Sequence, residues 1–377
     1  MYGLAVFDEL ISGLASVAEP DIERSFGASH AMATAMLFLV PGIVAFVVEP
    51  WLFLLADRYP RRWFIRGGLV AMAAASIAAA CARDPYVLAA AQAVKWCAIG
   101  AASGLAQATL VDGSGDKRAR TIARWSLLSL VGDLGAPALL AAVAIAGFGW
   151  RMGYAIASAL LAVWILAAWW VPIDGTGSEE DEDATSPGVI AAFKIALGDR
   201  QLLAWLFATA LCDLLDEIFI VLASIHVRDD FAASAAWQTA TVAALIAGNA
   251  IGLALLDRAL KKASELRVLA IAAAGCAVAY AAWMLAPSPL WSLVAMIPVG
   301  LCAGPLYPLA SAQAYAARPE SSGLVLAASH LFTPLGLAIP FGLGAIADLA
   351  GTRVALAVLL LEPVAICILA IRQHKPR

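Results

Sequence analysis

Charged residues are scarce in this sequence: Asp, Glu, Lys and Arg make up 14% of its 377 residues, whereas hydrophobic residues make up 63%. Soluble globular proteins carry about 25% charged and about 45–50% apolar residues. A single core cannot cover so much apolar surface, so a soluble globular domain is excluded. The composition instead indicates that lipid surrounds much of the chain.

Excess positive charge is also lacking, because the net charge is −4. A phosphate-binding surface needs clustered Lys and Arg, so we expect no nucleic acid partner. The six cysteines show no CxxC spacing and have no nearby His, so we interpret them as buried small side chains and expect no metal. Neither a GxxxxGK loop followed by Ser or Thr nor an HExxH motif occurs, which argues against ATP-driven pumping and metalloprotease chemistry. We therefore expect neither an enzyme nor a cofactor.

Long apolar runs, by contrast, are abundant. A membrane-spanning helix needs roughly 20 mostly apolar residues. Dividing the sequence at charges and at Pro/Gly clusters predicts spans near 2–19, 31–56, 64–82, 86–111, 121–146, 151–172, 201–225, 236–256, 266–286, 290–316, 322–347 and 352–371. The runs are too long and too little alternating for barrel strands. The prediction is an all-α membrane protein with twelve transmembrane helices.

A polar stretch separates the predicted helices into two six-helix bundles, 1–172 and 201–377. The linker 173–200 contains the acidic run Glu179–Asp183, interpreted as a solvated tether, and the segment VIAAFKIALGDR, interpreted as a short interfacial helix. Alternate loops and the C-terminal tail hold 18 Lys and Arg, against five in the opposite loops. Because basic loops stay in the cytoplasm, we expect both termini and the linker on the cytoplasmic side of a bacterial inner membrane.

An internal repeat relates the two bundles. LLADRYPRR around Asp57 matches LLDRALKK around Asp257 at an offset of 200 residues. FDELISGLASVAEPDIERSFGAS matches CDLLDEIFIVLASIHVRDDFAAS at an offset of 205, which pairs Asp8 with Asp213. At the offset of 200, two glycines of the fourth span match two of the tenth: Gly100 with Gly300, and Gly104 with Gly304. Duplicated six-helix halves are a transporter architecture with its site near the bilayer midplane.

The residues also resemble a known family. Twelve spans, a polar central linker and the loop Asp57-Arg58-Tyr59-Pro60-Arg61-Arg62 between spans two and three resemble the major facilitator superfamily over the whole chain. The resemblance implies the major facilitator fold and alternating access by two pseudo-symmetric bundles. It implies gating roles for the loop residues and their repeat partners: Asp57, Arg58, Arg61, Arg62, Asp257 and Arg258. Phe53 and Pro60 stand where the family has Gly, which weakens the expectation of close helix contact there. The resemblance names no substrate.

A second likeness concerns span five. SLVGDLGAPALL, with Gly132, Gly135 and Pro137, is similar to a degraded form of the Gly-Pro motif of drug/proton antiporters. FDELISG in span one is similar to the start of antibiotic-efflux members of the superfamily. Small residues and Pro also permit close packing and kinks in ordinary membrane helices, and this alternative stays open.

Ionisable residues inside the predicted spans are the candidates for chemistry, because a charge there costs at least about 2.5–3.5 kcal/mol. We assign proton coupling or substrate binding to these and to two other polar residues: Asp8 with its neighbour Glu9, Glu49, Lys95, Asp133, Asp213, Asp216, Glu217, Asn249 and His330. Asp213, Asp216 and Glu217 crowd one region of span seven, as a proton-coupling site requires. The alternative is a set of solvated residues in a wide cavity.

Several of these candidates have a structural alternative. Lys95 and Asp133 fall near the midplane on consecutive helices and form either a structural ion pair or part of a transport site. Asn249 is the repeat partner of Glu49, which indicates a shared cavity face or ordinary hydrogen bonding between helices. His330 is either a polar core residue or a proton relay.

The sequence favours a monomeric, proton-coupled exporter of a small organic molecule, with a cationic substrate matching the acidic interior. The partners are then the substrate, the proton and membrane lipid. One alternative is a proton-coupled symporter that imports a metabolite, in which Lys95 would hold an anionic group. A second alternative is a receptor or assembly protein that uses the same fold without transport.

Overall fold

The computed structural model describes residues 1–170, 189–319 and 321–373, and these ranges contain helices and no strand. Within them, ten helices are long and apolar enough to cross a membrane. Two more long helices, α1 (Gly3–Phe26) and α10 (Arg200–Phe231), carry more charge and bring the number to the expected twelve. The predicted tether Glu179–Asp183 lies outside the described residues.

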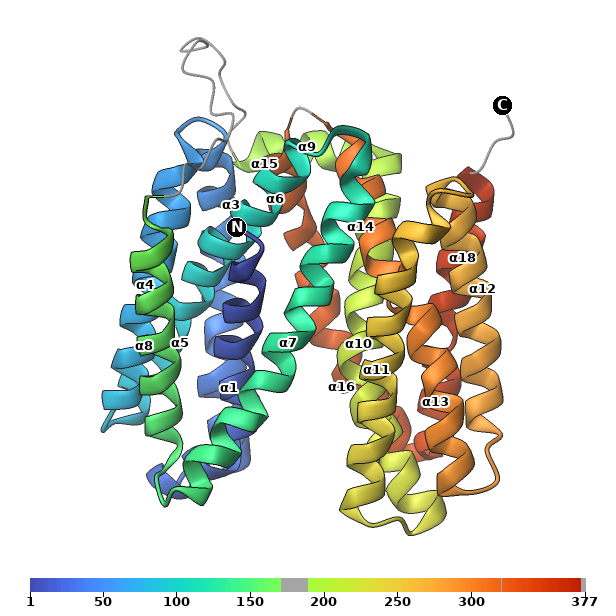
Figure 1. Cartoon of the computed structure of the whole chain (residues 1–377), viewed down its shortest axis with the longest axis horizontal. Helices are drawn as coiled ribbons and strands as arrows, with labels where there is room; N and C mark the ends of the chain where they lie inside the picture. The colour runs from blue at the N-terminus through green and yellow to red at the C-terminus, as the bar shows by residue number, and fades with distance from the viewer. Residues whose placement is uncertain (171–188, 320, 374–377) are drawn as a thin grey trace. The chain divides into compact units, whose positions relative to one another are not determined.

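The first half of the chain contains six long helical segments (Figure 1). They are α1; α2 (His30–Thr34) continued by η1 (Ala35–Leu39) and α3 (Val40–Ala56); α4 (Arg61–Cys81); α5 (Pro85–Ile99) continued by η2 (Gly100–Gly104) and α6 (Leu105–Asp112); α7 (Arg118–Ile145), preceded by the short η3 (Gly115–Lys117); and α8 (Trp150–Ala168). Both η1 and η2 are π-helical turns, which are common at functional sites.

The second half repeats this order after the short helix α9 (Val189–Gly198), the helix expected in the linker. Its segments are α10; α11 (Ala235–Ala259); α12 (Glu265–Met284); α13 (Pro289–Ala303) with α14 (Leu306–Ala317); α15 (Ser322–Ser329) with η4 (His330–Phe332) and α16 (Thr333–Ala350); and α17 (Thr352–Leu359) with α18 (Leu361–Gln373). The interfacial placement of α9 stays a prediction.

The chain forms two compact units, each of which includes a short segment from the other half of the sequence. Unit 1 comprises Met1–Gly115, Leu128–Ile195 and Glu320–Ala328; unit 2 comprises Asp116–Leu127, Ala196–Pro319 and Ser329–Arg377. Helix α7 therefore begins in unit 2 and ends in unit 1, whereas α15 belongs almost entirely to unit 1 and α16 to unit 2. The division at 172 and 201 stays a prediction.

Glycines let the helices of unit 2 approach closely. A Cβ atom at Gly248 of α11 would lie 2.3 Å from the Ile297 carbonyl oxygen of α13, and one at Gly300 would lie 2.1 Å from the Leu245 oxygen. Backbone contact of this kind is a common way to join helices in lipid, where apolar burial gives little drive. Gly248 and the repeated Gly300 thus lie where α11 and α13 pack together.

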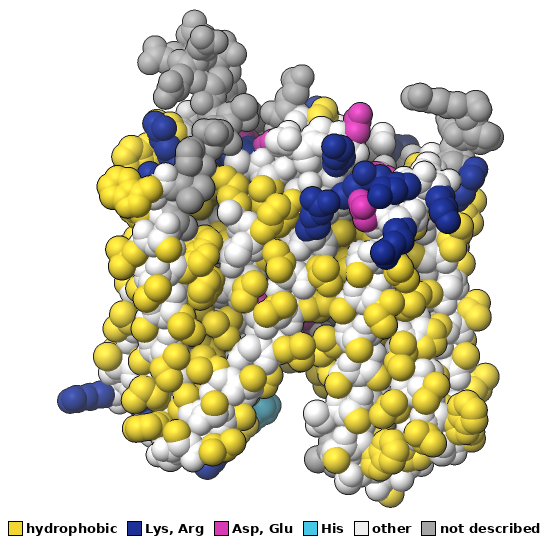
Figure 2. Space-filling model, viewed as in Figure 1, with side chains coloured by type: hydrophobic (Ala, Val, Ile, Leu, Met, Phe, Trp, Pro, Cys, Tyr) yellow, Lys and Arg dark blue, Asp and Glu magenta, His cyan; other side chains and the backbone are white. Residues whose placement is uncertain are grey.

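The helices present apolar side chains around their length. Val163 of α8, Val278 of α12 and Phe341 of α16 are among the large exposed hydrophobic residues, and yellow side chains cover much of each unit (Figure 2). Lys and Arg gather at the end of unit 2 where α11 meets α12 (Figure 2). This is the surface of a protein whose helices face lipid and whose basic ends face water.

Candidate functional site

Carboxylates from three helices meet inside unit 1. Asp8 of α1 interacts electrostatically with Asp133 of α7 and Glu49 of α3, and it lies beside Ser103 of η2. Asp8 and Glu49 are half-buried, whereas Asp133 is exposed. The structure therefore brings together three of the predicted site residues, named here the unit 1 carboxylate cluster.

The position of Glu49 depends on a missing side chain. A Cβ atom added at Gly100 would lie 2.4 Å from the Glu49 Oε1 atom, so this carboxylate could not keep its present position beside a larger residue. Gly100 opens the π-helical turn η2, where Ser103 also lies. The internal repeat drew attention to Gly100. Its contact with Glu49 is a local reason for a glycine at this position in the first half of the chain.

Helices α1 and α7 cross at glycines of the two segments that resemble efflux proteins, FDELISG in α1 and SLVGDLGAPALL in α7. A Cβ atom at Gly132 would lie 2.3 Å from the Val6 carbonyl oxygen, and one at Gly13 would lie 3.0 Å from the Ala136 Cβ atom. This crossing accounts for the small residues of span five through close packing, the structural alternative considered above. It also places Asp133, next to Gly132, close to the start of α1.

Lys95 is fully buried in α5. Its Nζ atom donates to the Ile11 carbonyl oxygen at 3.3 Å and lies 5.4 Å from the centre of the Tyr154 ring. The Tyr154 hydroxyl accepts a hydrogen bond from the Gln92 amide at 2.9 Å. In this conformation Lys95 therefore links α1, α5 and α8, and an ion pair between Lys95 and Asp133 stays a prediction.

In unit 2, Asp213 and Glu217 are exposed one turn apart on α10. The side chain of Asp216 lies outside the described residues. Asn249 is buried where α11 contacts Gly304, whose added Cβ atom would lie 2.7 Å from the Asn249 carbonyl oxygen. The roles assigned to these residues stay predictions.

His330 is half-buried in η4, 3.5 Å from the Thr333 hydroxyl, and its predicted role is likewise untested. A second histidine inside the helices was missed, because the predicted span ended at residue 225. Helix α10 continues to Phe231, so His226 is 1% exposed and its Nδ1 atom lies 3.0 Å from the Asp230 Oδ2 atom. Asp230 also pairs with Arg353 of α17 at 2.5 Å.

The loop motif of the first half contributes to a charged network in unit 1. Arg61 is 3% exposed and donates to Asp57 at 2.9 Å, to Asp112 at 2.7 Å and to the Ser322 hydroxyl at 2.6 Å. The Ser322 hydroxyl donates to Asp112 at 2.7 Å. The network, named here the Arg61 network, thus joins the turn before α4 to the end of α6 and the start of α15.

Asp57 also contacts the backbone of α15. It accepts a hydrogen bond from the Gly323 N–H, and a Cβ atom at Gly323 would lie 2.4 Å from its Oδ1 atom. Burial raises the pKa of Asp57, although the charge and hydrogen bond of Arg61 act in the opposite direction. Arg58 and Arg62 are exposed beside it. Sequence reasoning missed Asp112 and Ser322, because neither belongs to the loop motif.

The repeated motif of the second half has partners of its own in unit 2. The Asp257 carboxylate lies 3.1 Å from the Nε atom of Arg120, in the first turn of α7, and 3.7 Å from the Nζ atom of Lys261. Arg258 is exposed. Each half therefore pairs its motif aspartate with a residue at or near the start of a helix contributed by the other half.

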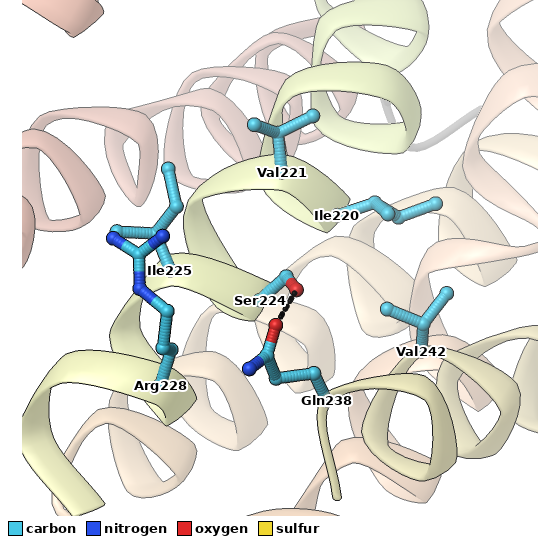
Figure 3. A pocket seen from close by; sticks show the side chains of 7 residues that line it. All are labelled: Ile220, Val221, Ser224, Ile225, Arg228, Gln238 and Val242. Atoms are coloured by element: carbon cyan, nitrogen blue, oxygen red, sulfur yellow. Dashed lines mark hydrogen bonds between the residues drawn. The ribbon is translucent and has the colours of Figure 1, made fainter. Parts of the chain in front are cut away.

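Unit 2 also contains a pocket of about 320 Å³ between α10 and α11 (Figure 3). Four aliphatic side chains, Arg228 and a hydrogen-bonded pair, Ser224 and Gln238, line it. Arg228 also pairs with Asp229 at 2.6 Å. None of the residues predicted for the site lines this pocket.

Comparison with known proteins gives matches over nearly the whole chain. The family model described as Major Facilitator Superfamily matches residues 1–341. No curated protein sequence matches.

Several solved transporters are similar in structure. The Escherichia coli fucose:proton symporter FucP is 14% identical, with a TM-score of 0.77 over 100% of this chain and 98% of that one. A bacterial homologue of the iron transporter ferroportin is 14% identical, with a TM-score of 0.73 over 98% of both chains. The proton:xylose symporter XylE is 12% identical, with a TM-score of 0.73 over 99% of this chain and 94% of that one. At these identities the likeness shows the fold alone.

Proposed function

Because the chain belongs to the major facilitator superfamily, a family of transporters, we propose that it moves a small organic molecule across the membrane in exchange for protons. The substrate leaves the cell as protons enter, and the two bundles expose the site to each side in turn. No ATP is used.

The unit 1 carboxylate cluster is the observation that carries this proposal. Asp8, Glu49 and Asp133 come from three different helices, and Asp8 interacts electrostatically with each of the other two. Grouped negative charges in an apolar unit favour the binding of positive charge, because the repulsion between them is poorly screened there. A proton and a cationic substrate can each provide that positive charge. If both compete for one cluster, binding of one releases the other, and this exclusion couples their movements.

The coupling is tested in sealed inverted vesicles that contain the purified protein. A ligand is first chosen by its ability to raise the thermal stability of the protein, since a ligand that binds the folded state stabilises it. Adding this ligand should release protons from the acidified lumen. Proton movement together with the ligand would favour the symport alternative, and no ligand flux would favour the receptor alternative.

The proposed orientation rests on the basic loops, because loops rich in Lys and Arg stay in the cytoplasm. The chain then spans the inner membrane with both termini and the linker 173–200 on the cytoplasmic side. Reporter fusions that are active only in the cytoplasm should therefore give a signal at the C-terminus and in the linker. Fusions after residue 83 or residue 232, in the less basic loops, should be silent. A silent linker fusion would overturn this orientation.

A further inference from the structure

Three potential metal ligands lie together where α1 passes into α2, in unit 1. Glu19 and Glu23 are one turn apart on α1, and Gly27 reverses the chain in a left-handed conformation with φ 59°. His30 then begins α2, where its Nδ1 atom lies 2.7 Å from Glu23 Oε1 and 3.7 Å from Glu19 Oε1. One ligand atom of each residue lies within 4.8 Å of the others.

The spacing matches that of a small metal ion. With bonds of about 2.0–2.1 Å, the ligand atoms of a tetrahedral zinc site lie about 3.3 Å apart. Of the two distances from the His30 ring, 3.7 Å is close to that value, whereas 2.7 Å is that of a hydrogen bond to Glu23, which a bound ion would replace. Thr34 donates to Glu19 Oε1 at 2.7 Å, the kind of neighbour that orients a metal-binding carboxylate. Glu19 and Glu23 are half-buried and His30 is exposed, so a cation can enter from solvent.

The repeat shows that the fold does not require these three side chains. At the offset of 205, the counterparts of Glu19 and Glu23 are Ser224 and Arg228. The chain turns there in the same left-handed conformation, at Ala232 with φ 47°. Figure 3 shows Arg228 and Ser224 beside the unit 2 pocket, with Ser224 bonded to Gln238. The same turn thus forms in unit 2 with Ser224 and Arg228 in place of the two glutamates.

We propose that Glu19, Glu23 and His30 bind a divalent first-row transition-metal ion, with Zn²⁺ the natural probe. The imidazole nitrogen favours such an ion over Mg²⁺, which prefers oxygen ligands, and Zn²⁺ also accepts carboxylate oxygens. Three protein ligands leave a fourth position for water. The ion would join α1 to α2 at the end of unit 1. The cysteine spacing and the lack of HExxH had predicted no metal, because neither pattern covers donors that a turn brings together.

The test measures Zn²⁺ binding to the purified full-length protein, without a histidine tag, by calorimetry in detergent. One Zn²⁺ should bind per chain, and His30→Ala and Glu23→Gln should each weaken the affinity at least tenfold. Asp21→Asn is the matched control, because it removes a carboxylate of the same helix that pairs with Arg24 instead. Its affinity should equal that of the wild type. Equal affinity in His30→Ala and the wild type, or no Zn²⁺ binding at all, would overturn the proposal.

A second measurement serves if the variants do not fold. Co²⁺ added to the unmodified protein should give the visible bands of a cobalt site with nitrogen and oxygen ligands, without the charge-transfer band of a thiolate. This separates the proposed site from a thiolate site at one of the six cysteines. A thiolate band would place the metal at a cysteine and refute the assignment.

Discussion

At the scale of single residues, Asp8 is the carboxylate whose removal tests the coupling proposal most directly. Asp8→Asn keeps the size of the side chain and removes its charge, so Glu49 and Asp133 lose the neighbour with which they interact. Gradient-driven transport should fall at least tenfold, and the pH dependence of ligand binding should flatten. Exchange of one ligand molecule for another across the membrane, which needs no net proton movement, should continue. Flux and ligand binding are measured across pH in the same vesicles.

Two other variants make the result interpretable. Asp21→Asn removes a carboxylate of α1 that pairs with Arg24, and it should transport normally. Asp213→Asn changes the repeat counterpart of Asp8 on α10. If Asp213→Asn abolishes coupling while Asp8→Asn transports normally, the coupling site lies in unit 2, as the crowding of acidic residues on α10 predicted.

At the scale of helices, the crossing of α1 and α7 depends on Gly132. Gly132→Ala would place a Cβ atom 2.3 Å from the Val6 oxygen, so the two helices must separate. Overpacking typically costs about 1–3 kcal/mol. The melting temperature of the variant should fall. Gly67→Ala in α4 is the control, since nothing lies within 4 Å of its added Cβ atom and Ala is about 1 kcal/mol more favourable in a helix. A Gly132→Ala protein as stable as Gly67→Ala would contradict this account.

Helix α10 is capped by Asp199, whose carboxylate accepts hydrogen bonds from the N–H groups of Gln201 and Leu202, both at 3.1 Å. The Leu202 bond is the main cause of the lowered pKa of Asp199, and the nearby Arg318 lowers it further. A lowered pKa stabilises the fold above the unfolded value of about 3.9, and this contribution is lost as the pH falls through the folded pKa. Asp199→Ala should therefore cost about 0.5–2 kcal/mol at neutral pH.

That cost should shrink in acid, because the wild type loses its own carboxylate contribution there. Asp199→Asn keeps a good capping side chain and should cost less than the alanine variant at neutral pH. Melting temperatures of the three proteins at pH 7 and at the lowest pH the detergent tolerates would show both effects. A cost for Asp199→Ala that does not change with pH would contradict the assigned role of the charge.

The helices themselves could largely be predicted from the sequence, because long apolar runs need a membrane and turn residues mark their ends. Asp84 before Pro85 is one such mark, since it caps α5 as the predicted fourth span begins. The partners of the charged loop could not be predicted. Arg61 binds Asp112 and Ser322, which lie 51 and 261 residues further along the chain, and no local pattern encodes such distances. The burial of His226 was missed for a related reason, because α10 extends one turn and a half past its apolar run.

At the scale of the whole molecule, the Arg61 network is the expected control point for alternating access. Asp57→Asn weakens the hydrogen bonds that join the turn before α4 to the start of α15, because Asp57 accepts from both Arg61 and the Gly323 N–H. Transport should slow severalfold and ligand binding should change little. Labelling of engineered cysteines by a membrane-impermeant maleimide should show a shift in which side of the membrane is accessible.

Gly323→Ala provides an independent way to disturb the contact between Asp57 and the start of α15. Its added Cβ atom would lie 2.4 Å from the Asp57 Oδ1 atom, so it should change accessibility as Asp57→Asn does. Arg62→Gln is the control from the same motif, since Arg62 is exposed. Loss of ligand binding with unchanged accessibility would contradict a gating role for the network.

The exchange of segments between the two units also affects the order in which the protein can fold as it is synthesised. A ribosome delivers all of the first half long before Ser322, which lies 210 residues after Asp112. Until α15 emerges, Arg61 and Asp112 lack the Ser322 hydroxyl that each of them contacts, and unit 1 remains incomplete beside the growing chain. The last stage of folding of the first half is therefore set by translation of the second. A ribosome-bound chain that ends before residue 320 should be open to proteases at the turn before α4, and one that extends well past 328 should be protected.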